Sequence, residues 1–170
     1  MYCNFGEPLL YASNDGGARW HKLPAVQVPK GAPAPRAGGG MSLTTVDGSR
    51  LAVSLQLDGT TRVATVIATS TNGGRSWRSR LVRGYWSADL LDQRHWRLIN
   101  GSTLLSTDDA GGHWQRRQAA TGTPETADFL PRQFGFLVPD SRGTPLRWTS
   151  DDGASWKPIT VTAGPYTVGG

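Results

Sequence analysis

Cysteine is almost missing from this chain of 170 residues, since Cys3 is the only one. A single thiol excludes an internal disulfide framework and a metal site built from several thiolates. No run approaches the roughly 18 apolar residues of a membrane-spanning helix, and the first residues lack the basic-then-apolar order of a secretion signal. We therefore expect no membrane span in this chain.

Helical patterns are also lacking. No long stretch has apolar residues at i, i+3, i+4 and i+7 without an interrupting Gly or Pro. The 22 Gly and 11 Pro suit many tight turns, while the 37% hydrophobic content is ordinary for a globular chain. The sequence therefore predicts an all-β fold, in which the Pro-rich segment 29–36 forms a loop.

Lysine is scarce too, with three residues, so the net charge of +5 comes almost wholly from Arg. Several arginines cluster in 75–83, and Arg116 and Arg117 take the equivalent place one repeat later. One interpretation is a track for phosphates or another polyanion. The other, which we adopt, is a charged outer strand that protects a sheet edge from aggregation. Since no recognition helix accompanies the charge, we do not expect a nucleic-acid partner.

One phrase occurs four times: Ser or Thr, a spacer, Asp or Asn, a spacer, Gly, two spacers and Trp. The Gly can take a positive φ, and the hydroxyl and carboxyl groups can bond nearby backbone N–H groups. An apolar or β-branched run precedes each copy, and a mixed run follows it. Each copy therefore predicts the turn of a β-hairpin. The residues are Ser13, Asp15, Gly17 and Trp20; Ser70, Asn72, Gly74 and Trp77; Thr107, Asp109, Gly111 and Trp114; and Thr149, Asp151, Gly153 and Trp156.

These four stretches resemble the Asp-box, or BNR repeat, and only Asn72 departs from its pattern. The resemblance implies a β-propeller of the sialidase-like superfamily. It places each box in the loop between the third and fourth strands of a blade, on the face away from the ligand site. The box residues then have structural roles, and their tryptophans pack between blades.

The intervals between the box tryptophans are 57, 37 and 42 residues, which bracket the roughly 40–50 residues of a four-stranded blade. We therefore expect one domain over 1–170, a propeller or propeller fragment of about four four-stranded antiparallel blades. Three alternatives for the incomplete first blade stay open: the tail around residues 166–168 supplies a strand, the chain is part of a larger ring, or an open row pairs with a second copy. The expected blades are 1–27, which is partial, and 40–83, 84–119 and 125–162.

In a propeller, ligands bind on the face formed by the loops between blades. On that face the sequence predicts candidate binding residues, which form no recognised catalytic set: Arg36, Arg83, Tyr85, Trp86, Glu125, Asp140 and Arg142. The Arg-Ile-Pro motif of sialidases does not occur, and His21, His95 and His113 lack metal-ligand spacing. We therefore expect no catalytic residue, no metal and no cofactor. The carboxyl groups that could serve a glycosidase stand in turn-like contexts: Asp58, Glu125, Asp128 and Asp140.

These expectations favour a non-catalytic module that acts as a binding or assembly platform. A protein or glycan partner fits this interpretation, as does a second copy of the chain. The alternative is a segment of a glycoside hydrolase, sialidase-like or xyloglucanase-like, whose catalytic residues lie partly outside this chain. A third hypothesis is a polyanion binder that uses the arginine clusters. The sequence does not determine the compartment, although the resemblance favours an extracytoplasmic one.

Overall fold

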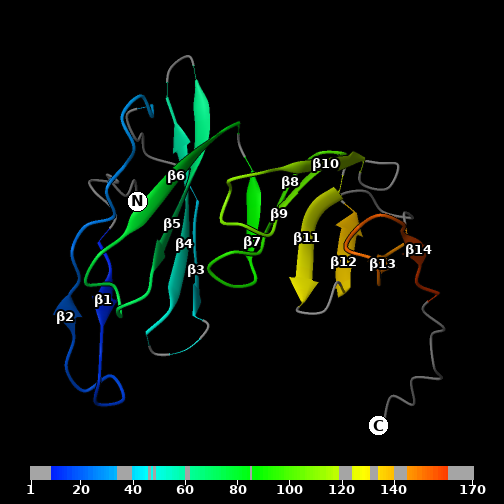
Figure 1. Ribbon diagram of the computed structural model, residues 1–170. Coiled ribbons are helices and arrows are strands. Elements are labelled where there is room, and N and C mark those ends of the chain that lie inside the picture. The colour runs from blue at the N-terminus through cyan, green and yellow to red at the C-terminus, as the bar shows by residue number, and fades with distance from the viewer. Residues whose placement is uncertain are drawn as a thin grey trace, which may run out of the picture.

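The computed structural model is built from β-strands that form four antiparallel sheets. It describes residues 9–33, 40–45, 47, 49–59, 62–84, 86–118, 124–130, 134–139 and 145–160, and this part of the chain contains no helix. Figure 1 shows the four sheets standing side by side in chain order. We refer to them as the first to the fourth sheet.

Each sheet is formed by strands that follow one another in the sequence. The first sheet has two strands, β1 (Tyr11–Ala12) and β2 (His21–Lys22). The other three have four strands each. The second sheet contains β3 (Met41–Thr45), β4 (Leu51–Asp58), β5 (Val63–Ser70) and β6 (Arg78–Arg83). The third contains β7 (Ser87–Leu90), β8 (Trp96–Asn100), β9 (Thr103–Thr107) and β10 (Gln115–Gln118). The fourth contains β11 (Pro124–Leu130), β12 (Phe134–Pro139), β13 (Arg147–Thr149) and β14 (Lys157–Pro158).

The two faces of the second sheet pack on different neighbours, because successive side chains of a strand point to opposite faces. Val53 and Val66 join Leu10 and Leu23 of the first sheet in one apolar cluster. Ala52 directly precedes Val53 and Ile67 directly follows Val66, so both point to the opposite face of the sheet. There they join a cluster with the third sheet. The strands β4 and β5 are therefore buried on both faces.

The third sheet repeats this arrangement. Leu98 and Trp96 pack toward the second sheet, whereas Ile99 and Leu104 pack with Phe129 and Leu137 of the fourth sheet. Each interior interface is thus made of apolar side chains from facing sheets, which exclude water on contact. The row of stacked sheets follows because alternate side chains of β4, β5 and β8 pack on opposite neighbours.

The all-β class and the repeated four-stranded antiparallel sheets that the sequence predicts are confirmed. The described residues do not close into a ring, so the propeller stays a prediction. No helix suited to crossing a membrane occurs in the described ranges.

Candidate binding site

The four box turns share one pattern of hydrogen bonds. In the first, Gly17 N donates to Ser13 Oγ over 2.8 Å and Arg19 N donates to Asp15 Oδ1 over 2.9 Å. In the fourth, Gly153 N donates to Thr149 Oγ1 and Ser155 N donates to Asp151 Oδ1, both over 2.9 Å. The second and third turns repeat these bonds from Gly74 to Ser70, Ser76 to Asn72, Gly111 to Thr107 and His113 to Asp109.

These bonds occupy the acceptor atoms of the box carboxylates. The hydroxyl and backbone N–H of Ser155, with the Thr149 hydroxyl, lower the pKa of Asp151 to about 2. Bonds from the backbone and ring of His113 hold the pKa of Asp109 far below its ordinary value. Hydrogen bonds donated to a carboxylate favour its charged form and so lower its pKa. The box carboxylates are therefore ionised turn anchors, with little capacity left for a ligand.

Three of the four box tryptophans lie against the preceding sheet. Trp77 donates its indole N–H to the Pro24 carbonyl over 3.1 Å, and its ring joins the cluster between the first and second sheets. The ring centre of Trp114 lies 6.2 Å from that of Trp96, in the cluster between the second and third sheets. Trp156 joins the cluster between the third and fourth sheets. Trp20 differs, because it is 64% exposed and no described sheet precedes it. The expected packing role therefore requires a preceding sheet.

Only part of the predicted ligand face lies within the described residues. Arg36, Tyr85, Asp140 and Arg142 lie outside them, and so does the side chain of Glu125, whose backbone is in β11. Arg83 and Trp86 come together through the Trp86 indole N–H, which donates to the Arg83 carbonyl over 2.6 Å. Trp86 also packs on the apolar cluster between the second and third sheets. Trp86 therefore serves the interface between sheets with its ring and its N–H.

Arg83 lines a cavity of about 650 Å³ together with Lys30 and Arg62. Its lining also includes Val63 and Leu81, so cationic and apolar groups meet in this cavity. A site of this kind would suit an anion that carries an organic part. Of the two predicted ligand residues whose side chains the structure describes, Arg83 lines this cavity and Trp86 does not.

A buried ion network joins the third and fourth sheets, and no pattern in the sequence predicts it. Arg97, 6% exposed, donates from Nε to Asp152 Oδ1 over 2.5 Å and from Nη2 to Asp108 Oδ1 over 3.1 Å. Its Nη1 donates to two backbone carbonyls. Arg117 donates to the Asp152 carbonyl over 2.8 Å. A guanidinium buried to this extent needs such partners.

Asp89 is a further carboxyl that sequence reasoning missed. It lies in β7 and accepts a hydrogen bond from Phe129 N of the fourth sheet over 2.5 Å. Burial raises the pKa of Asp89 to about 6. The hydrogen bond from Phe129 N opposes this rise, and the nearby Asp128 carboxylate adds to it. Only the contact between two sheets creates this environment, so spacing along the chain could not reveal it.

A second cavity, of about 620 Å³, opens between the second and third sheets. We call it the rim pocket. Three arginines line it with hydroxyl groups, and the lining includes Arg78, Arg80, Arg94, Thr71, Ser76 and Ala110. Across the described ranges, no three His, Cys, Asp or Glu side chains gather closely enough to hold a metal ion.

Comparison with known families finds no family model that matches the chain, and comparison with curated proteins finds no match. The likeness to the Asp-box therefore stands on the four phrases in this sequence.

Proposed function

We propose that this chain is a segment of an Asp-box propeller that acts as a non-catalytic binding or assembly platform. The observation that carries the proposal is the outward face of the fourth sheet, which points away from the third. Its apolar side chains have no described neighbouring sheet over them: Leu130, Phe134, Phe136, Val138, Leu146 and Trp148.

The register of the sheets supports the proposal. In each four-stranded sheet, one residue of the second strand pairs with the box hydroxyl residue: Leu51 with Ser70, Trp96 with Thr107 and Gly135 with Thr149. The residues that follow these are Ala52, Arg97 and Phe136. Ala52 is 0% exposed and Arg97 6%, but Phe136 is 39% exposed. Phe136 thus occupies a position that the other two sheets bury under their neighbour.

The third strands give the same comparison. Ile67 and Leu104, each three residues before the box hydroxyl, are fully buried by the following sheet, whereas the equivalent Leu146 is 38% exposed. A large contiguous apolar patch marks an interaction site more often than an inert surface. The partner that fits is an apolar antiparallel sheet with a box turn, because this is what covers the same positions elsewhere in the chain.

The test compares the wild type with Phe136→Asp, which places a charge on the outward face. We expect the wild type to bind an apolar fluorescent dye and to self-associate in light scattering, and the variant to lose both with little change in melting temperature. Leu137→Asp, on the buried face of the same strand, is the contrast that should unfold the sheet. Equal dye binding and association in the wild type and Phe136→Asp would overturn the proposal.

A segment of a glycoside hydrolase is the second candidate, and Asp89 is the observation that favours it. A general acid in such an enzyme needs a carboxyl whose pKa is raised toward neutrality, and the pKa of Asp89 is raised to about 6 by burial. Turnover of aryl glycosides that disappears in Asp89→Asn would support the enzyme and contradict the platform.

A further inference from the structure

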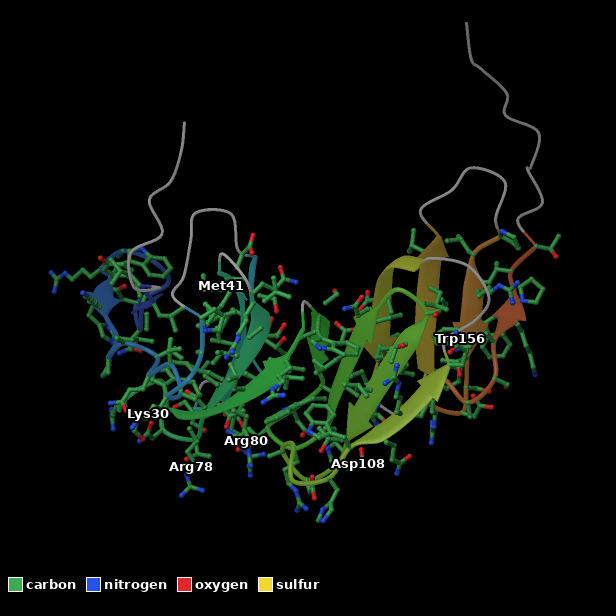
Figure 2. All side chains as sticks on the ribbon, turned by 90° about the horizontal axis from the view of Figure 1, so that it is seen from above. Lys30, Met41, Arg78, Arg80, Asp108 and Trp156 are labelled. Atoms are coloured by element: carbon green, nitrogen blue, oxygen red, sulfur yellow. The ribbon has the colours of Figure 1, made fainter. Side chains whose placement is uncertain are left out.

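The rim pocket is the outer, polar continuation of the interface between the second and third sheets. Arg78 pairs with Thr69 and Arg80 with Ile67, so both arginines lie on the face of β6 that turns toward the third sheet. Arg94 reaches the pocket from the turn before β8. Figure 2 shows Arg78 and Arg80 along the same edge of the row as Asp108, opposite Met41.

The described lining of the rim pocket is cationic. No Asp or Glu occurs among the described residues that line it. Among the described residues of the chain, the guanidinium groups of Arg78, Arg80 and Arg94 make no ion pair. Arg97 and Arg117, which lie outside the pocket, do make ion pairs. Three like charges around one cavity repel one another, and an anion placed between them would relieve that repulsion.

The next interface along the row shows where such an anion belongs. Arg117 is equivalent to Arg80, since each lies three residues after its box tryptophan. Asp152 is equivalent to Ala110, since each directly precedes the box Gly, and their φ angles of 59° and 60° agree. At the third–fourth interface, Asp152 therefore provides a carboxylate and a carbonyl to the arginines around it.

At the second–third interface, Ala110 leaves the equivalent position without a carboxylate. Arg80 Cδ lies 3.7 Å from the place that a methyl group on the neighbouring Gly111 would take, so this arginine does reach the box turn. The Gln93 amide also crosses the interface and donates to the Ser70 carbonyl over 2.5 Å. The two sheets are thus held together here, and a cationic cavity remains between them.

We propose that the rim pocket binds a tetrahedral oxyanion, phosphate or sulfate, carried on a small organic molecule, in the place that Asp152 fills at the next interface. Guanidinium groups bind tetrahedral oxyanions through paired, charge-assisted hydrogen bonds. The hydroxyls of Thr71 and Ser76 add donors. The volume of about 620 Å³ exceeds the need of one inorganic ion and lies in the range of small-molecule sites.

The test is calorimetric titration of the chain at low salt with glucose 6-phosphate, glucose 6-sulfate and glucose. We expect one site for each ester and none for glucose. The arms also separate the two sources of the oxyanion, because the second ionisation of a phosphate near pH 6 strengthens its binding as the pH rises, while a sulfate ester keeps its charge. Binding of glucose equal to that of the esters would overturn the proposal.

Variants locate the site. Ala110→Asp places the carboxylate of the next interface into the pocket, so we expect at least about a tenfold loss of ester affinity together with a higher melting temperature. Arg80→Gln should lose affinity without this gain in stability, and Arg94→Gln gives an independent measurement. Arg117→Gln is the matched control, which should lower stability and leave ester binding unchanged. Wild-type affinity in Ala110→Asp and Arg80→Gln, or an equal loss in Arg117→Gln, would contradict the proposal.

Discussion

The first and fourth box turns have the same hydrogen bonds but different surroundings. In both, the box Gly donates to the hydroxyl residue and the Asp accepts a backbone N–H four residues on. The fourth turn packs on Leu104 of the third sheet, whereas Gly17 has only Trp20 near it. The hydrogen bonds of each turn therefore depend only on residues within the turn. The burial of its tryptophan depends on the sheet that precedes it.

The glycines of the two turns should differ most on substitution. Gly153 and Gly17 both have positive φ, but a methyl group on Gly153 would collide with Leu104 Cδ2, while its nearest neighbour at Gly17 is 3.7 Å away. We expect Gly17→Ala to cost about 1 kcal/mol for the left-handed backbone, and Gly153→Ala about 2–4 kcal/mol because overpacking adds to it. Urea denaturation measures both. Equal losses of unfolding free energy in the two variants would show that the Leu104 side chain moves aside without cost.

The acidic groups near the two turns should respond to pH in opposite directions. Burial raises the pKa of Asp89, at the third–fourth interface, to about 6, whereas the backbone N–H of Arg19 lowers the pKa of Asp15. A raised folded pKa means that stability from this group is complete below about pH 4 and is lost as the pH rises through 6.

Asp89→Asn keeps an acceptor for Phe129 N and removes the ionisation. We expect the variant to gain up to about 3 kcal/mol over the wild type at pH 7 and nearly nothing at pH 4. Thermal melts across this range provide the measurement. Asp15→Asn should instead be less stable than the wild type at pH 7 and approach it as the pH falls, because a carboxyl group whose pKa is lowered by folding stabilises the fold only above its unfolded pKa. A pH-independent gain in Asp89→Asn would refute the assignment.

The tryptophans extend the comparison. Trp156 packs edge-on to Phe129 with centroids 5.9 Å apart, and its buried indole N–H has no partner among the described residues. Trp156→Ala should cost about 2–3 kcal/mol, less than a fully buried aromatic, whereas the exposed Trp20→Ala should cost under about 1 kcal/mol. Trp156→Phe is the control, expected to be nearly neutral because it removes the unpaired N–H. A larger loss for Trp20 would indicate that the first turn has a partner.

The hydroxyl residues should give the smallest contrast. Thr149 is buried and Ser13 only half-buried, although each accepts bonds from two backbone N–H groups. Loss of a buried acceptor leaves those groups unpaired, so Thr149→Ala should cost about 1–2 kcal/mol, while water can replace the hydroxyl in Ser13→Ala at about 0.5–1 kcal/mol. Chemical denaturation of the two variants decides this.

The turns and the stacked sheets could be predicted because their causes lie within a few residues. The phrase from Thr149 to Trp156 contains the donors and acceptors of its own turn, and the alternation in 51–58 sets both faces of its strand. The roles of Arg97 and Asp89 could not be predicted, because their partners lie 55 and 40 residues away. The sequence suggested a charged outer strand for Arg80, but its orientation toward the third sheet requires the pairing register of β5 and β6.

The outward face of the fourth sheet differs in kind from the exposed side of the first, where Leu9, Tyr11 and Trp20 lie. A contact that joined these two surfaces would be heterologous, with every added molecule offering the same free surface again. Such contacts end in a closed ring when the rotation between molecules allows it and continue as a filament when it does not. Lys157, whose Nζ lies 5.3 Å from the centre of the Trp148 ring, and the net charge of +5 act against uncontrolled growth, because each addition brings like charges together.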